Sequence, residues 1–264
     1  MSRLSLVVVL SLLTVSGCGA FAGPDPKDAR VAHAEYELAA DAFHRQRYRA
    51  ALGHIIRSLD LDDENPQAAY LRAMTLVAFC ANDAESSDCR YADAERWARR
   101  TLEIDPQMRD ARNALGVILV HRGRPTEAMA VLKPLANDML YRSPEKAWGN
   151  LGWAQLRAGD VDEAIDSLKR SVAAQPRFCV GYYRLGLAYE KKGEHTAARH
   201  ALSRALTAAD GRCARLQDAF WARSRVFRAL GQMVALQEDL QRCQDLGTTT
   251  RVGRRCRRAL RDLR

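Results

Sequence analysis

A motif that recurs at an interval of about 34 residues is the feature of this sequence that most restricts its fold. Its clearest copy is AWGNLGWAQLRAGDVDEAIDSLKRSVAAQP, residues 147–176. This copy combines a large residue, a Leu-Gly pair, a later small residue and a final proline, namely Trp148, Leu151, Gly152, Ala164 and Pro176. Gly159 and Asp160 predict a turn between two helices, and Gly152 and Ala164 are small where antiparallel helices would press together. A period of this length predicts stacked two-helix units.

Further copies extend the motif over most of the chain. The copy that follows the clearest one contains Tyr182, Leu185, Gly186 and Ala198. The copy that precedes the clearest one contains Leu115, Gly116, Gly123 and Ala128. Two less regular copies come earlier and a degenerate one comes last, marked by Leu38, Tyr48, Tyr70, Ala94, Phe220 and Leu240. These copies resemble tetratricopeptide repeats over residues 32–246. The resemblance implies an all-α fold, a right-handed superhelical solenoid of about six repeats. An ordinary amphipathic bundle, the alternative, would show the apolar spacing but not Leu-Gly and Ala in phase.

The N-terminal residues predict export and a lipid anchor. Residues 4–15 (LSLVVVLSLLTV) form an apolar run of 12, too short to span a bilayer and typical of a signal peptide. The stretch VSGC, residues 15–18, closes this run and resembles a bacterial lipobox, which implies a signal peptide over residues 1–17, lipidation of Cys18 and a linker over residues 18–31. An aspartate directly after the lipidated cysteine resembles an inner-membrane retention signal, but this chain has Gly19 at that position. We therefore expect the protein to be anchored in the outer membrane, on its periplasmic face. The alternative is an ordinary signal peptide with a chance cysteine.

The six cysteines that remain predict disulfides, because an even number fits an oxidising compartment. The expected pairs are Cys80–Cys89, Cys243–Cys256 and Cys179–Cys213. The first pair brackets an insertion in the second copy, and a helical hairpin at the end of the chain would bring the second pair together. The third pair joins residues that both begin a repeat. Equivalent positions of stacked repeats usually lie too far apart for a disulfide, so this pairing requires the linker at residues 210–212 to fold back.

The C-terminal segment carries much of the net charge of +9. After Thr250 the chain reads RVGRRCRRALRDLR, in which seven arginines accompany one aspartate. We expect residues 247–264 to form a basic helix that caps the solenoid. An exported protein meets little nucleic acid, so we expect no nucleic-acid partner, and anionic lipid or an acidic partner is the expected counterpart of this charge.

No catalytic motif occurs in the sequence. It has no GxxxxGK[ST], GxSxG, HExxH or paired CxxC, and its histidines are scattered. A zinc site would need four ligands, and neither His nor a further Cys lies near Cys80 and Cys89. We therefore predict no enzyme, no metal and no cofactor. The alternative is a cell-wall hydrolase with an unrecognised arrangement of residues, which an assay on peptidoglycan would detect.

Function in a repeat solenoid resides in the concave face, which the first helix of each repeat lines. Five positions of that helix point away from its partner helix, and they select Tyr36, Phe43, Leu71, Phe79, Asn113, His121, Asn150, Trp153, Tyr183, Arg184 and Lys191. The N-terminal part of this predicted groove is apolar and aromatic, and the later part is polar, which indicates binding of a peptide or helix. The alternative is that some of these residues only pack inside the protein, Phe79 beneath the loop between Cys80 and Cys89.

A lipobox followed by six repeats and no other domain resembles the type IV pilus pilotin family, the PilF-, PilW- and Tgl-like lipoproteins. The resemblance implies an outer-membrane lipoprotein, held in lipid by its acyl anchor. Such a protein binds the secretin subunit of the type IV pilus machine and promotes its localisation and oligomerisation. Two further resemblances give alternatives, an NlpI-like or a BamD-like adaptor for other envelope proteins. The NlpI-like adaptor would be a tight homodimer, and the BamD-like one would have fewer repeats and a different tail.

Overall fold

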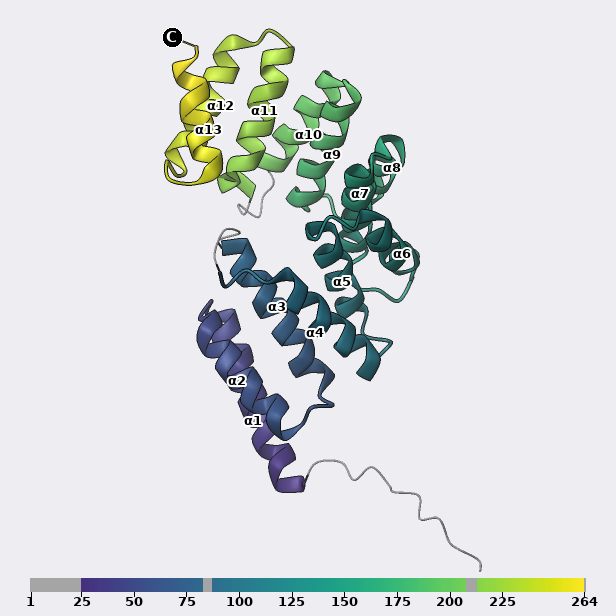
Figure 1. Ribbon diagram of the computed structural model, residues 1–264. Helices are drawn as coiled ribbons and strands as arrows, with labels where there is room; N and C mark the ends of the chain where they lie inside the picture. Colours follow the sequence, from purple (N-terminus) through teal and green to yellow (C-terminus); the bar gives the residue numbers. More distant parts are fainter. Residues whose placement is uncertain (1–24, 83–86, 208–212, 264) are drawn as a thin grey trace, which may run out of the picture.

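The chain is helical throughout the part that the computed structural model describes, residues 25–82, 87–207 and 213–263 (Figure 1). The predicted signal peptide and Cys18 lie outside these residues. The helices are α1 (Pro26–His44), α2 (Tyr48–Leu61), α3 (Pro66–Asn82), α4 (Tyr91–Ile104), α5 (Arg109–His121), α6 (Pro125–Ala136), α7 (Pro144–Ala158), α8 (Val161–Ala174), α9 (Cys179–Lys192), α10 (His195–Thr207), the 3₁₀ turn η1 (Cys213–Arg215), α11 (Gln217–Ala229), α12 (Met233–Asp245) and α13 (Arg251–Arg261).

The helices form a solenoid of antiparallel pairs. Each odd-numbered helix from α1 to α11 packs against the even-numbered helix that follows it, and each pair packs against the next. Helix α13 packs on α12 and α11 and closes the C-terminal end, so that α1 and α13 lie at opposite ends of the curved molecule (Figure 1). Within the described residues the six pairs and the terminal helix agree with the predicted all-α solenoid and its cap.

Helix α1 begins at Pro26, inside the segment expected to be linker. Proline suits the first helical position because its missing N–H would have no partner there. Asp25 caps the same end, since its side chain accepts a hydrogen bond of 2.7 Å from the Lys27 backbone N–H.

Small residues are required where the helices of a pair cross. In three successive pairs a glycine of the first helix faces a leucine of the second, as Gly116–Leu132, Gly152–Leu168 and Gly186–Leu202. A methyl group on these glycines would lie 2.4, 2.6 and 2.5 Å from the leucine Cγ. At Gly152 the backbone oxygen of Ala164 is also only 3.0 Å away, so neither helix can retreat freely. The prediction that Gly152 is small because of helix packing is confirmed.

The turns inside the pairs use a left-handed residue. Gly123, Gly159, Gly193 and Gly231 have φ of 72°, 106°, 84° and 70°. Gln46 adopts φ of 60° at the corresponding place in the first pair. A side chain is disfavoured in this conformation, because Cβ approaches the following carbonyl oxygen. The first repeat therefore carries local strain that the four glycines avoid.

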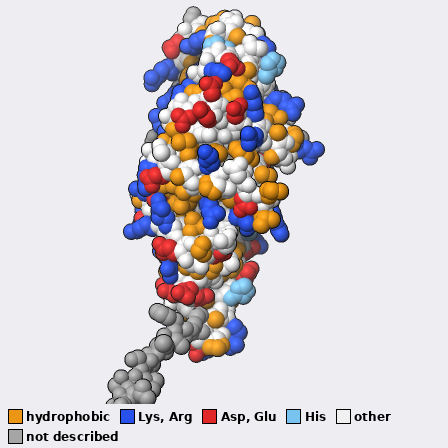
Figure 2. All heavy atoms as spheres, turned by 90° about the vertical axis from the view of Figure 1, so that its right-hand side faces the viewer, with side chains coloured by type: hydrophobic (Ala, Val, Ile, Leu, Met, Phe, Trp, Pro, Cys, Tyr) orange, Lys and Arg blue, Asp and Glu red, His pale blue; other side chains and the backbone are white. Residues whose placement is uncertain are grey.

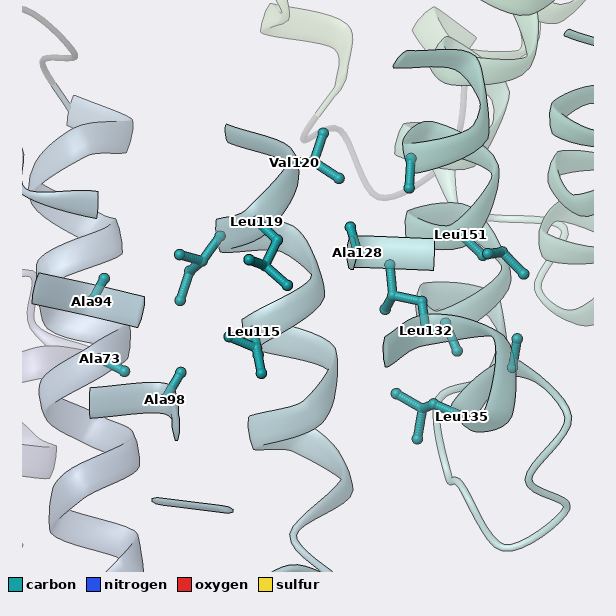
Figure 3. Packing of buried hydrophobic residues seen from close by; sticks show 14 of the residues in the cluster. Ala73, Ala94, Ala98, Leu115, Leu119, Val120, Ala128, Leu132, Leu135 and Leu151 are labelled. Carbon is teal, nitrogen blue, oxygen red and sulfur yellow. The ribbon is translucent and has the colours of Figure 1, made fainter. Parts of the chain in front are cut away.

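The buried side chains form a core that continues from pair to pair. In its largest cluster, Ala73 and Ala94 of the second pair, Leu115 and Leu119 of α5, and Leu151 of α7 lie within one packed layer (Figure 3). Alanines sit where helices approach closely and leucines fill the spaces between them. Each pair thus buries its apolar side against its neighbours, as expected for a stacked repeat.

Glu95 of α4 is a buried carboxylate that joins the second and third pairs. It accepts hydrogen bonds from Arg99 on its own helix, at 2.8 Å, and from Arg122 and Arg124 in the α5–α6 turn. Burial raises the pKa of Glu95, but the hydrogen bonds from Arg99 and Arg122 outweigh it and hold this pKa below its ordinary value. The surface on the right-hand side of Figure 1 carries charges of both signs. Cations and anions are interspersed there among hydrophobic side chains (Figure 2).

The structure contains the three expected disulfides, with Cα–Cα distances of 4.3 Å for Cys80–Cys89, 5.9 Å for Cys179–Cys213 and 6.1 Å for Cys243–Cys256. One premise was wrong. Cys213 does not begin a repeat helix, because α11 starts at Gln217 and Cys213 lies in η1. Because η1 lies beside α10, Cys213 comes close to Cys179, the first residue of α9. The two Cα atoms are therefore near enough for a disulfide, unlike equivalent positions of stacked repeats.

Candidate functional site

The odd-numbered helices carry the predicted groove. Consecutive odd helices contact one another along the solenoid, α5 with α7, α7 with α9 and α9 with α11. In Figure 1, α5 and α7 lie toward the inner side of the curve and α6 and α8 toward the outer side. The residues expected to line this face lie on α1 (Tyr36, Phe43), α3 (Leu71, Phe79), α5 (Asn113), α7 (Asn150, Trp153) and α9 (Tyr183, Arg184).

A polar ladder crosses the middle of this concave face. The side-chain amide of Asn150 donates a hydrogen bond of 2.8 Å to Asn113 Oδ1. The Arg184 guanidinium donates to Asn150 Oδ1 at 2.7 Å and to the Gly149 carbonyl at 3.1 Å. Three helices are therefore joined side by side, α5 to α7 to α9. Asn113, Asn150 and Arg184, which the repeat positions predict separately, are brought together as one group.

Aromatic rings lie against the cation of this ladder. The Arg184 guanidinium lies 4.6 Å from the centre of the Trp153 ring, a distance typical of a cation–π contact. The His121 ring meets Trp153 edge-on at 4.9 Å, and Tyr91 stacks on His121 at 4.6 Å. Helices α4, α5, α7 and α9 thus contribute to one cluster. We define the binding ladder as Asn113, Asn150, Arg184, Trp153, His121 and Tyr91.

The binding ladder carries positive charge without a matching carboxylate. Burial lowers the pKa of Arg184 to about 10, which still leaves it charged at neutral pH. His121 is exposed, but partial desolvation of its ring and the charges of Arg184 and Arg157 lower its pKa below the ordinary value of 6.5, so the imidazole is neutral at pH 7. Within the described residues Arg184 forms no ion pair. Its recorded hydrogen bonds go to two neutral oxygens, those of Gly149 and Asn150.

The N-terminal part of the concave face is apolar and half-buried. Tyr36, Phe43 and Leu71 pack against the core between the first and second pairs. The rings of Phe43 and Phe79 are linked by Tyr48, at centre-to-centre distances of 5.5 Å and 6.1 Å. Phe79 also packs against the largest core cluster. Only part of each ring is therefore open to a partner, and packing accounts for much of the role of these residues.

Tyr183 is placed differently from the other predicted groove residues. It packs against the core between α9, α10 and α11, and burial raises its pKa to about 12. On the same helix, Lys191 donates a hydrogen bond of 3.2 Å to the Leu156 carbonyl of α7, so this lysine does reach along the concave face. Tyr183 and Arg184 are both half-buried, but Tyr183 packs toward α10 and α11, whereas Arg184 reaches along the concave face to α7.

Two rings of the concave face were not found from the sequence. Tyr48 and Tyr91 are the first residues of α2 and α4, the second helices of their pairs. The repeat positions predicted to line the groove lie only on the first helix of each pair. Both tyrosines directly follow a turn, where a second helix begins beside the end of a first helix, and this is the signal that could have identified them.

The site is built from polar and aromatic side chains. It presents amide groups, one guanidinium and several ring faces, which suit an extended or helical protein segment. Among the described residues no cluster of three His, Cys, Asp or Glu side chains could hold a metal ion. In the same part of the chain, no helix has the length and apolar character needed to cross a bilayer.

The sequence matches family models of the tetratricopeptide repeat at residues 89–139, 135–177 and 181–211. These matches correspond to α4–α10, and the structure extends the same paired arrangement to α1–α3 and to α11–α12. No curated protein matches the chain.

Solved structures resemble this chain over most of its length. PilW, described as a widely conserved type IV pilus biogenesis factor, is 25% identical with a TM-score of 0.70, and the alignment covers 86% of this chain and 98% of PilW. PilF of Pseudomonas aeruginosa is 15% identical with a TM-score of 0.65, covering 88% and 99%. A tetratricopeptide-repeat protein of Parabacteroides merdae is 13% identical with a TM-score of 0.68, covering 88% and 84%. The last two likenesses concern the fold alone.

Proposed function

Because this chain is a tetratricopeptide-repeat protein, we propose that it acts by binding a protein of the type IV pilus machine, and that this partner is the secretin subunit. The observation that carries the proposal is the likeness to PilW, which extends over 98% of that protein at 25% identity. The concave face supports it, since the binding ladder carries a cation that forms no ion pair within the described residues, and its Tyr91, His121 and Trp153 rings are at least partly exposed.

The proposed mechanism is binding without turnover. A secretin segment lies along the concave face, with its apolar side chains on the half-buried rings near Phe43 and Phe79. One of its carboxylates or carbonyls accepts hydrogen bonds from Arg184. The bound segment is shielded from water until oligomerisation of the secretin buries it. This sequence of events promotes assembly of the ring in the outer membrane.

Lipidation of Cys18 is the second part of the proposal. The segment between Cys18 and the start of α1 at Pro26 spans at most about 30 Å when extended. The acyl chains therefore hold the N-terminal end of the solenoid near the periplasmic face of the outer membrane. This attachment is stable because two or more acyl chains anchor a protein firmly, whereas a single chain binds only weakly.

The test is secretin oligomer formation in cells, scored as heat- and detergent-resistant bands. We expect the bands to be lost without the gene and strongly reduced with Arg184→Gln. The matched control is Arg170→Gln, because Arg170 lies 4.7 Å from the Trp148 ring centre in a similar cation–π contact formed between α8 and α7, outside the binding ladder. Arg184 is a better site for change than Phe43 or Leu71, which pack on the core.

Both variants must be present at the normal level for this comparison. Normal oligomers in cells that lack the gene contradict the pilotin function. That outcome would leave an NlpI-like or BamD-like adaptor for another envelope assembly as the role of the chain. Normal oligomers with Arg184→Gln alone contradict only the assignment of the binding ladder.

A further inference from the structure

Helix α13 presents one face made almost entirely of arginine. Six of the residues in Arg251–Arg261 are arginines, and all of them are exposed: Arg251, Arg254, Arg255, Arg257, Arg258 and Arg261. The opposite side of the helix is apolar. Cys256 and Ala259 are buried there, and Val252 and Leu260 pack against the core of α11 and α12. At 1.5 Å per residue the arginine face is a stripe about 16 Å long.

The helix that carries this stripe is held in a fixed position. The Cys243–Cys256 disulfide joins it to α12. The Gln217 side chain of α11 donates hydrogen bonds to the Cys243 and Gly247 carbonyls, at 2.6 and 2.8 Å. Thr250 caps the helix by accepting a hydrogen bond of 2.9 Å from the Gly253 N–H. The arginines therefore project from a rigid support and lose little freedom of the backbone when they bind.

The stripe is not neutralised within the protein. Among the described residues none of the α13 arginines forms an ion pair. The Arg254 side chain donates a hydrogen bond to the Thr249 carbonyl, which carries no formal charge. The neighbouring helix α11 behaves differently. Its Arg223 pairs with Asp239 at 2.7 Å, and its Arg225 pairs with Glu190 at 2.6 Å. Clustered like charges repel one another, so the arrangement is suited to an anion from outside.

We propose that the arginine face of α13 is a docking surface for an acidic protein segment rich in Asp and Glu. The planar forks of arginine form paired hydrogen bonds with carboxylates, and α13 uses arginine for every one of its cations. A membrane-surface helix inserts its apolar side into the bilayer, but the apolar side of α13 is already buried against α11 and α12. A narrow stripe on one helix matches an extended or helical segment.

This surface is separate from the binding ladder and does not depend on the proposed function. It lies at the C-terminal end of the solenoid, at the opposite end from α1 (Figure 1). A partner that occupied both surfaces would contact α7 and α9 with one segment and α13 with an acidic one.

The test measures binding of fluorescent poly-L-glutamate to the full chain carrying Cys18→Ala, which keeps it free of lipid. The variant replaces Arg254, Arg258 and Arg261 by glutamine. The matched control replaces the exposed Arg30, Lys133 and Lys169 by glutamine, which removes the same charge from three scattered places on α1, α6 and α8. We expect affinity to fall about tenfold or more with the α13 variant and by much less with the control.

Two outcomes would overturn the proposal. If the α13 variant and the control lose the same affinity for poly-L-glutamate, binding depends only on the net charge of the protein and not on the arginine face of α13. Vesicles containing phosphatidylglycerol serve as the second probe. If they bind tightly through the same three arginines while poly-L-glutamate does not, the surface docks on membranes instead. Melting curves of both variants establish that each remains folded.

Discussion

The guanidinium of Arg184 lies 4.6 Å from the centre of the Trp153 ring, so a charge on α9 rests on a ring from α7. The same guanidinium donates to Asn150 on that helix. One side chain therefore connects neighbouring repeats across the concave face and also leaves that face positively charged. Stability of the solenoid and the proposed recognition of a partner meet in this residue, so we expect a change there to affect both.

The packing of Gly152 predicts a sharp difference between two glycines. Gly152→Ala places a methyl group 2.6 Å from Leu168 Cγ, and we expect it to lower the free energy of unfolding by about 1–3 kcal/mol. Gly53 of α2 has its nearest neighbour 3.8 Å from such a methyl group, so Gly53→Ala is expected to stabilise by about 0.5–1 kcal/mol. Urea unfolding measures both changes. Equal effects at the two sites would contradict the close helix crossing.

The strain at Gln46 predicts a stabilising substitution. Gln46→Gly should raise the free energy of unfolding by up to about 1 kcal/mol, because glycine adopts φ of 60° without a steric penalty. The reverse change, Gly159→Gln, should destabilise at the equivalent turn of the fourth pair, where φ is 106°. Thermal melting is sufficient to compare them. A lower melting temperature for Gln46→Gly would show that its side chain contributes more than its backbone conformation costs.

Glu95 predicts a pH dependence of stability with a definite sign. Its pKa in the folded protein lies below the ordinary value of 4.5, because the hydrogen bonds and charges of Arg99 and Arg122 prevail over burial. Its contribution is therefore complete above pH 4.5 and is lost as pH falls through the lower folded pKa. Glu95→Gln should cost about 1–3 kcal/mol at neutral pH and progressively less in acid. A cost that did not shrink on acidification would contradict the ion pairing.

The Cys243–Cys256 disulfide is expected to stabilise the C-terminal end. It closes a loop with a sequence separation of 13, for which the chain-entropy model gives about 2–3 kcal/mol. Replacing both cysteines by serine should lower the urea midpoint and increase hydrogen exchange in α13. Unchanged exchange in α13 would mean that Gln217 and Thr250 hold the helix without the covalent bond.

The repeat pattern predicts the fold well because each of its small residues is required by a close contact between the two helices of one pair. The positions of Gly116, Gly152 and Gly186 recur with the period of the helical pair, and each faces a leucine of the next helix. The disulfide pairs could also be predicted, but the place of Cys213 could not. Periodicity placed Cys213 at the start of a repeat, whereas it lies in η1 ahead of α11. The expected fold-back of the linker at residues 210–212 lies outside the described residues.

The site was harder to predict than the fold. The repeat positions select Asn113, Asn150 and Arg184, and the structure joins these three residues in one hydrogen-bonded group, since a solenoid repeats its geometry. They fail for Tyr48 and Tyr91, which enter the concave face from second helices. They also do not distinguish Tyr183, which packs inward, from Arg184 beside it. Packing between neighbouring pairs decides these cases, and it depends on side chains far apart in sequence.

Binding of the secretin subunit on the concave face can be measured by calorimetric titration of the chain with purified secretin subunits. We predict binding by the wild-type protein and by Arg170→Gln, and at least about tenfold weaker binding by Arg184→Gln, because the last variant removes a charge-assisted hydrogen-bond donor from the binding ladder. Equal affinities for all three proteins would contradict the placement of the partner on the concave face, and no binding by the wild type would contradict the proposed partner itself.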